Sequence, residues 1–317
     1  MHKKKVLICG ATGFIGRNIA ESLLLKDDFE VYGTFHSSQP WHHEKVQMIK
    51  ADLTRKEDVE KAVQGKDIII QAAATTSGAH DIVNKPYYHV TDNAVMNSLI
   101  FRAAHDNNIQ HVIFFSCTVM YPSSDIPLTE SDFDPNREIH PLYYGAGWTK
   151  VYIEKMCEFF SRLKKTKYTV IRHSNIFGPY DKFDLKRSHV FGATVAKVMA
   201  ASHGNIEVWG DGKTARDMLY VSDLVDFVER ALSKQETAFE LCNVGSGYAI
   251  TVKDLVEKII SHAERDFIVK YDKSKPSINT RLSVNTSYSK KIFGWEPHVR
   301  LDDGIKKTLS WYQSHYS

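Results

Sequence analysis

The chain has 317 residues, of which 43% are apolar and 25% are charged, as in ordinary globular proteins of one or two closely packed domains. Its formal net charge of +3 is small and its basic residues are dispersed, which argues against nucleic acid as a partner. No apolar run approaches the roughly 20 residues of a membrane span. We therefore expect small anionic ligands as partners.

The cysteines are far apart and form no CxxC or Cys/His pair, which predicts neither a disulfide framework nor a metal site. They are Cys9, Cys117, Cys157 and Cys242. The basic start MHKKK precedes an apolar run of about five residues without a cleavage site, unlike a signal peptide. We expect a soluble, cytoplasmic protein.

Short β-branched runs alternate with amphipathic segments in the first half of the chain. The runs occupy residues 5–10, 29–35, 46–52, 67–73, 111–117 and 168–174, and the helical segments 17–26, 57–65, 93–108 and 150–165. This alternation predicts an α/β fold, a doubly wound Rossmann parallel sheet with helices on both faces. We expect the dinucleotide-binding domain to span residues 1–172.

The pattern changes after about Ser174, where longer irregular pieces appear at 178–189 and 208–218. Between and after them lie helical segments at 190–202, 222–234 and 252–263 and a strand at 268–272. We predict a smaller, mixed α/β C-terminal substrate lobe over residues 173–317. A segment near 217–245 is expected to return to the first sheet.

The sequence GATGFIG, residues 10–16, follows the first strand and opens a helix. Gly10, Gly13 and Gly16 permit a tight turn, close approach of backbone N–H groups to a pyrophosphate, and close packing of helix on strand. The same turn contains Thr12, Phe14, Ile15 and Arg17. This context predicts a dinucleotide cofactor.

Two later segments support that prediction. Asp52, followed by Leu53, ends the third run where a carboxylate can accept from an adenine amine. The small side chains that end the fourth run let a cofactor lie against the backbone; they are Ala72, Ala73 and Ala74. Each segment alone is equally typical of a helix cap or a tight loop, but the glycine turn favours the cofactor interpretation.

The second run ends without the acidic residue that usually binds the ribose 2′-hydroxyl of NAD. Arg17, His36, Ser37 and Ser38 can instead donate hydrogen bonds to a 2′-phosphate. The sequence favours NADP(H) as the cofactor and leaves NAD(H) open.

Further motifs occur along the chain in the order SCTVMYP, WTKVYIE, VIRHSNIFGPYD, KRSHV, VWGDGKTARDMLYVSDL, NVGSG and SKPSINTR. With the glycine turn, they resemble the extended short-chain dehydrogenase/reductases of the NAD-dependent epimerase/dehydratase family that act on nucleotide sugars. Within that family the chain is most similar to the GDP-fucose synthases. The resemblance implies a Rossmann domain, a nucleotide-sugar lobe and a homodimer joined through a four-helix bundle.

The resemblance also implies hydride-transfer chemistry by a Ser or Thr, a Tyr and a Lys. Lys150 matches the lysine, which lowers the pKa of the tyrosine and holds the cofactor ribose. The serine position falls on Cys117, and because a thiol is a weak hydrogen-bond donor, Thr118 beside it is a candidate for this role. Val119 replaces the cysteine of the GDP-fucose synthase epimerase pair, so epimerisation by that route is not expected.

Ala146 occupies the position of the family tyrosine, and a methyl group cannot transfer a proton. Tyr143 or Tyr144 could fold back towards Lys150 if residues 145–147 form a loop; in a continuous helix Tyr143 would lie about 10 Å from the lysine along the axis. Alternatively, Ala146 is an introduced substitution, another acid such as His189 acts, or the protein binds without catalysing.

The resemblance implies a set of substrate-binding residues in the second half. Asn175 matches a residue that reaches the sugar diphosphate, and His189 matches an acid of the GDP-fucose synthases. Trp209 resembles a tryptophan beside the guanine, and Arg216 matches an arginine on the diphosphate, for which its planar donors are suited. We expect two further cations to close over the same diphosphate, Lys275 and Arg281.

These residues lead to a hypothesis of an NAD(P)-dependent oxidoreductase or epimerase. It would act at C4 of a GDP-linked deoxyhexose or heptose as a 4-ketoreductase, 4-epimerase or 4-dehydrogenase. The alternative is a catalytically silent protein of the same fold that binds cofactor and nucleotide sugar without turnover.

Overall fold

The computed structural model describes residues 3–75, 86–185, 188–201, 203–275, 278 and 280–316. Its centre is a seven-stranded parallel sheet in the order β10-β6-β5-β4-β1-β2-β3. The strands are β1 Lys4–Cys9, β2 Phe29–Phe35, β3 Val46–Lys50, β4 Ile68–Gln71, β5 His111–Phe115, β6 Lys167–His173 and β10 Phe239–Val244. The predicted doubly wound sheet is confirmed.

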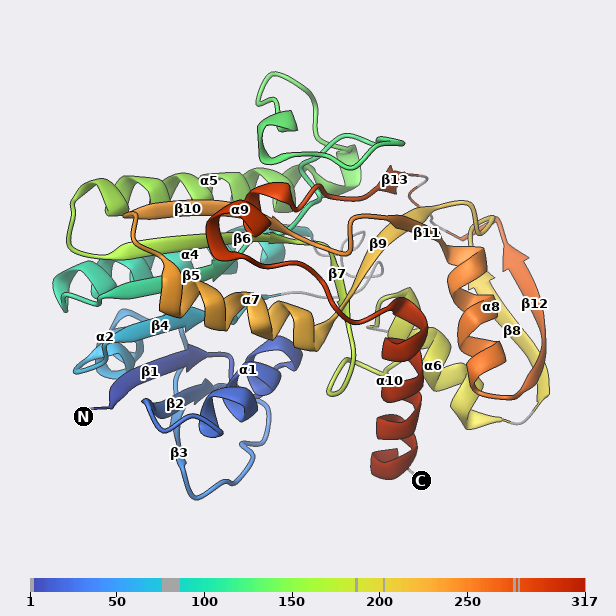
Figure 1. Ribbon diagram of the computed structural model, residues 1–317, viewed down its shortest axis with the longest axis horizontal. Helices are drawn as coiled ribbons and strands as arrows, with labels where there is room; N and C mark the ends of the chain where they lie inside the picture. Colours follow the sequence, from blue (N-terminus) through green and yellow to red (C-terminus); the bar gives the residue numbers. More distant parts are fainter. Residues whose placement is uncertain are drawn as a thin grey trace.

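Helices cover both faces of this sheet, as Figure 1 shows. On one face α1 (Phe14–Leu24), α7 (Val221–Lys234) and α9 (Ser287–Phe293) contribute to one buried apolar cluster. On the other face α2 (Lys56–Val63), α4 (Pro86–Asp106) and α5 (Tyr144–Arg162) contribute to a second. The central strands β4 and β5 are buried along their whole length, which explains their nearly continuous apolar sequences.

A smaller part of the structure lies beside the carboxyl ends of the central strands (Figure 1). Its sheets have the order β11-β9-β13, with β7 also paired to β9, and β12-β8. The strands are β7 Asn175–Phe177, β8 His203–Trp209, β9 Ala215–Tyr220, β11 Ala249–Thr251, β12 Asp266–Asp272 and β13 Arg281–Leu282. They pack with α6 (Val190–Ala200), α8 (Val252–His262) and α10 (Leu301–Tyr316) around a third apolar cluster. The predicted smaller α/β part is therefore present.

The prediction of an irregular segment at 208–218 is wrong. Its ends belong to β8 and β9, and the turn between them contains Gly210 and Gly212 with φ of 86° and 76°. These glycines interrupt the apolar alternation by which a strand is recognised in sequence.

No helix in the described ranges is long and apolar enough to cross a membrane. Within the same residues, no group of three His, Cys, Asp or Glu side chains is arranged to hold a metal ion. All four cysteines lie in described segments and are unpaired.

Candidate active site

The glycine turn between β1 and α1 has the shape that a dinucleotide pyrophosphate requires. Gly10 has φ of 76°, and a Cβ atom there would lie 2.8 Å from the Ala73 Cα; a Cβ on Gly16 would collide with the Gly10 carbonyl. Gly13 precedes α1 as its cap and carries no side chain that could occupy the first-turn N–H groups. Those groups can bind an anion, so the residues of this turn fit the cofactor.

Asp52 and Leu53 follow β3 at the neighbouring edge of the sheet. The Asp52 Oδ1 atom accepts from the Thr54 hydroxyl at 2.6 Å and the Thr54 N–H at 3.0 Å, and these bonds lower the carboxyl pKa. Both hydrogen bonds from Thr54 go to Oδ1 of the carboxylate. The other oxygen, Oδ2, is the atom that would accept from the predicted adenine amine. His36 is exposed at the end of β2 and its charge lowers the Asp52 pKa further.

Ala72, Ala73 and Ala74 leave the carboxyl end of β4, and Ala73 lies directly against the glycine turn. The segment proposed from the sequence continues to Thr76, which lies outside the described residues. Ala73 therefore packs against Gly10 at the carboxyl edge of the sheet, and the contact of this segment with a cofactor stays a prediction.

Lys150 projects from α5 to the carboxyl end of β5. Its Nζ donates to the Phe115 carbonyl at 2.7 Å and lies 4.7 Å from the centre of the Phe114 ring. Burial lowers the pKa of Lys150, while the nearby Cys117 and Glu154 raise it. This places a cation at the carboxyl end of β5, near Cys117.

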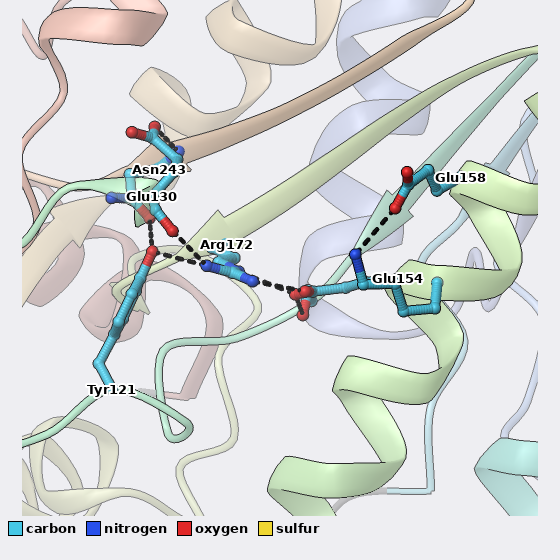
Figure 2. Close-up of polar contacts among 8 residues, drawn as sticks. Tyr121, Glu130, Glu154, Glu158, Arg172 and Asn243 are labelled. Atoms are coloured by element: carbon cyan, nitrogen blue, oxygen red, sulfur yellow. Dashed lines mark hydrogen bonds and ion pairs between the residues drawn. The ribbon is translucent and has the colours of Figure 1, made fainter. Parts of the chain in front are cut away.

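A buried network holds this part of α5 in place (Figure 2). The Arg172 Nη2 atom donates to Glu154 Oε2 at 2.7 Å, and Ser116 donates to Glu154 Oε1 at 2.5 Å. Arg172 also donates to the Tyr121 hydroxyl at 2.9 Å, which in turn donates to Asn243 Oδ1 at 2.8 Å. The network joins β6, α5, the segment after β5 and β10.

Cys117 lies close to both Lys150 and Tyr143. Burial raises the pKa of the Cys117 thiol and the Lys150 charge opposes that rise. Cys117 and Tyr143 pack in one small apolar cluster, and Thr118 next to Cys117 is buried. The Tyr143 hydroxyl interacts with Arg216; burial raises the tyrosine pKa and Arg216 opposes this. Lys150, Cys117, Tyr143 and Arg216 are therefore gathered in one region.

The hypothesis that residues 145–147 form a loop is wrong, because α5 is helical from Tyr144 onward. Gly145 and Gly147 serve close packing: Cβ atoms there would lie 2.7 Å from Val90 Cγ2 and 2.9 Å from Ile139 Cδ1. Ala146 thus sits in the first turn of the helix. Tyr144 is 60% exposed, whereas Tyr143 is half-buried and interacts with Arg216 and Cys117.

Arg216 is anchored at the seam between the two parts of the molecule. Its Nη1 donates to the Thr280 hydroxyl at 2.6 Å and the Thr280 carbonyl at 2.9 Å. Asn175 donates to the Asp217 carbonyl at 3.2 Å, which places it beside Arg216 on β9. The Lys275 Nζ lies 6.0 Å from the centre of the Trp209 ring, so these two predicted substrate residues are neighbours.

The side chain of Arg281 does not lie beside that of Arg216. In the parallel pairing of β13 with β9, Arg281 is opposite Ala215 and Leu282 is opposite Arg216. Because successive strand residues point to opposite faces, the two arginine side chains leave opposite sides of the small sheet. Arg281 instead lies 3.5 Å from the exposed Asp125 and lines a separate open cavity beside α8 and α10.

His189 is the N-cap residue of α6. Surrounding protein desolvates its ring and lowers its pKa, and Lys182 adds to this effect, although part of the side chain is exposed. His173, which the sequence reasoning overlooked, lies close enough to His189 and Lys150 to feel their charges. Burial lowers the His173 pKa to about 4, with both charges contributing. The feature of the sequence that could have pointed to His173 is its position at the end of a predicted strand, directly after Arg172.

Comparisons with known proteins identify the family of the chain. Residues 6–245 match the model of the NAD dependent epimerase/dehydratase family. The chain is 31% identical to GDP-L-colitose synthase of Yersinia pseudotuberculosis over 97% of both chains. It is 26% identical to GDP-L-fucose synthase of Azorhizobium caulinodans over 98% of this chain and 96% of that one.

The solved structure of UDP-N-acetylglucosamine 4-epimerase from Methanobrevibacter ruminantium, in complex with UDP-N-acetylmuramic acid, is similar throughout. Its TM-score is 0.85 at 25% identity, and the match covers 99% of each chain. The glycine turn, the lysine of α5 and these full-length matches identify the chain as a member of the NAD-dependent epimerase/dehydratase family.

Proposed function

We propose that this protein is an NAD(P)-dependent nucleotide-sugar enzyme that acts at C4 of a GDP-linked deoxyhexose or heptose. It would serve as a 4-ketoreductase, 4-epimerase or 4-dehydrogenase. The observation that carries the proposal is the proximity of Lys150, Cys117, Tyr143 and Arg216 at the carboxyl end of the sheet. Cys117 and Tyr143 share one apolar cluster, and the charge of each flanking cation acts on the pKa of its neighbour. The names of the GDP-sugar relatives support the choice of nucleotide.

The cofactor, when bound, supplies or accepts the hydride. Lys150 would hold the cofactor ribose, and Thr118 with Cys117 would orient the C4 oxygen of the sugar. Arg216 and Lys275 would bind the diphosphate, with Asn175 beside them and Trp209 against the guanine. Arg281 is left out of this set because its side chain leaves the opposite face of the sheet from Arg216.

A proton must reach the C4 oxygen during reduction, and Ala146 cannot deliver it. Tyr143 is the phenol that shares the apolar cluster of Cys117, and the Arg216 charge opposes the rise in its pKa. We infer that Tyr143 donates this proton, with a neighbouring cation favouring the phenolate that remains. His189, at the start of α6, is the competing donor.

Ala146 itself favours a second candidate function. A family member without the usual phenol near Lys150 can retain cofactor and nucleotide-sugar binding and lack turnover. This binding protein would use the same glycine turn, Lys150 and Arg216.

We also propose that the protein is a cytoplasmic homodimer. The exposed apolar side chains on the packed pair α4 and α5 include Val95 at 44%, Tyr152 at 54% and Phe159 at 58%. A second copy of this helix pair would cover them in a four-helix bundle. The four unpaired cysteines fit a reducing compartment.

Transfer of deuterium from labelled NADPH tests the proposed reaction. The protein is incubated with 4-deuterated NADPH and a GDP-4-keto-6-deoxyhexose, and the sugar is analysed by NMR and mass spectrometry. One deuterium at C4 is the expected product. Binding of both ligands without any label in the sugar would favour the silent binding protein, and label at another carbon would contradict action at C4.

A further inference from the structure

The guanidinium group of Arg17 lies against two aromatic rings. Its Cζ lies 3.7 Å from the centre of the Trp41 ring and 4.9 Å from that of Tyr180. Its Nε donates to Glu21 Oε1 at 2.7 Å, and the Tyr180 hydroxyl donates to the same oxygen at 2.8 Å. The side chain is thus fixed in position by two ring contacts and one ion pair.

This stack is attached to the cofactor turn. Arg17 directly follows Gly16 in the first turn of α1, and the Trp41 Nε1 donates to the Ala11 carbonyl at 3.0 Å. Ala11 lies within the glycine turn, between the carboxyl ends of β1 and β2. In a Rossmann fold the adenosine ribose of the cofactor binds at the end of β2, next to this turn.

Tyr180 belongs to a different part of the chain, after β7. The Asn18 side chain donates to the neighbouring Pro179 carbonyl at 2.9 Å, and the Trp311 ring of α10 lies 4.9 Å from the Tyr180 ring. Tyr180 has φ of 67°, a left-handed conformation that is uncommon for a bulky residue. A strained backbone persists where surrounding contacts over-determine it, which here they do.

We propose that Trp41 and Tyr180 are positioning residues that hold Arg17 ready for the 2′-phosphate of NADP(H), so that the sugar-binding part of the chain contributes to cofactor selection. The inference rests on the proposed function only in requiring that the protein binds a nicotinamide dinucleotide. A pre-positioned guanidinium binds a phosphate through charge-assisted hydrogen bonds. The 2′-hydroxyl of NAD(H) carries no charge and gains little from it.

Cofactor affinity, measured by isothermal titration calorimetry without any sugar, tests the proposal. Dissociation constants for NADPH and NADH are compared in the unsubstituted protein, Arg17→Ala, Trp41→Ala, Tyr180→Ala and Tyr180→Phe. Loss of one stacking ring is expected to weaken NADPH about threefold to tenfold and to change NADH less than twofold. Tyr180→Phe keeps the ring and should fall between the unsubstituted protein and Tyr180→Ala.

The matched control is Tyr316→Ala, whose ring belongs to the same aromatic group but packs on Phe183, Trp311 and Tyr312. It is expected to leave both affinities unchanged. In an Arg17→Ala background, Tyr180→Ala should cause no further loss of NADPH affinity, because the residue acts through Arg17.

Three results would overturn the proposal. The first is equal affinity of the unsubstituted protein for NADPH and NADH. The second is an equal loss of affinity for both cofactors in Tyr180→Ala. The third is a further loss of NADPH affinity when Tyr180→Ala is added to Arg17→Ala. Because no sugar is present, a lack of catalytic turnover would leave these measurements interpretable.

Discussion

Glu154 and Arg172 form an ion pair with both side chains almost fully buried, 2.7 Å between Oε2 and Nη2, one helical turn beyond Lys150. A buried pair is weak evidence for stability by itself, but removal of one partner leaves an uncompensated buried charge. The pair therefore fixes the part of α5 that carries the lysine.

Glu154→Gln is expected to lower the free energy of unfolding by about 3–5 kcal/mol, because the guanidinium of Arg172 would remain buried without its counter-charge. Urea denaturation measures this change. Glu158→Gln on the same helix is the matched control: its partners Lys155 and Arg162 are more than 70% exposed, so the change should stay below about 1 kcal/mol. Equal losses in the two variants would contradict the role assigned to the buried pair.

Tyr143→Phe is expected to reduce kcat for sugar reduction by about 10²–10⁴-fold, the usual contribution of a positioned proton donor. Tyr144→Phe removes the hydroxyl of the adjacent, 60% exposed tyrosine and should leave kcat unchanged. Steady-state NADPH oxidation with each variant decides between them. If His189→Gln abolished turnover while Tyr143→Phe retained it, His189 would be the donor.

The buried His111 predicts a component of acid sensitivity. Its Nε2 lies 2.8 Å from the Thr169 hydroxyl, and burial lowers its pKa to about 4. Between that value and the unfolded pKa near 6.5, the unfolded chain binds the extra proton, so stability falls as the pH decreases through this range. The difference between the folded and unfolded pKa values of this imidazole corresponds to roughly 3 kcal/mol of unfolding free energy.

The measurement is the difference in unfolding free energy between the unsubstituted protein and His111→Gln, from pH 7 to pH 4. The two proteins must be compared because other groups also make stability depend on pH. Burial raises the pKa of Asp181 to about 7, and this carboxyl group changes stability with pH in the opposite direction to His111. His111→Gln should make the protein less sensitive to acid. An unchanged pH slope would contradict a folded-state pKa of His111 below its unfolded value.

Phe159→Glu is expected to convert a dimer into monomers, because it places a charge in the proposed α4–α5 interface. Sedimentation velocity reports the mass directly. Leu25→Glu is the control, since Leu25 is 88% exposed at the end of α1, away from this face. A protein that is monomeric before substitution, or a Leu25 variant that also dissociates, would contradict the interface.

Much of the fold could be predicted from the sequence because the strands of a buried parallel sheet are continuous apolar runs. The strands β4 and β5 are examples, and the glycine turn after β1 carries its own steric requirement. The strands of the smaller part were harder to find, since β8 is largely exposed and β13 has two residues. Their pairing depends on contacts that are distant along the chain.

Candidate site residues could be named from the sequence where chemistry is tied to a local motif, as for Lys150 and Arg216. Their placement was not predictable where strand register or packing decides. The register of β13 against β9 separates Arg281 from Arg216. The glycine-rich segment at 145–147 is helical, and its glycines allow close packing against Val90 and Ile139. The stack of Trp41, Arg17 and Tyr180 likewise joins residues that are far apart in sequence.

The most direct test of the proposed reaction is the absorbance at 340 nm when the unsubstituted protein and Ala146→Tyr each meet NADPH and a GDP-4-keto-6-deoxyhexose. We predict that NADPH is oxidised by the protein as it stands, with Tyr143 supplying the proton, and that the rate depends on both Lys150 and Tyr143. Oxidation by the Ala146→Tyr variant alone would contradict this, and would show that the unsubstituted chain binds its ligands without catalysing the reaction.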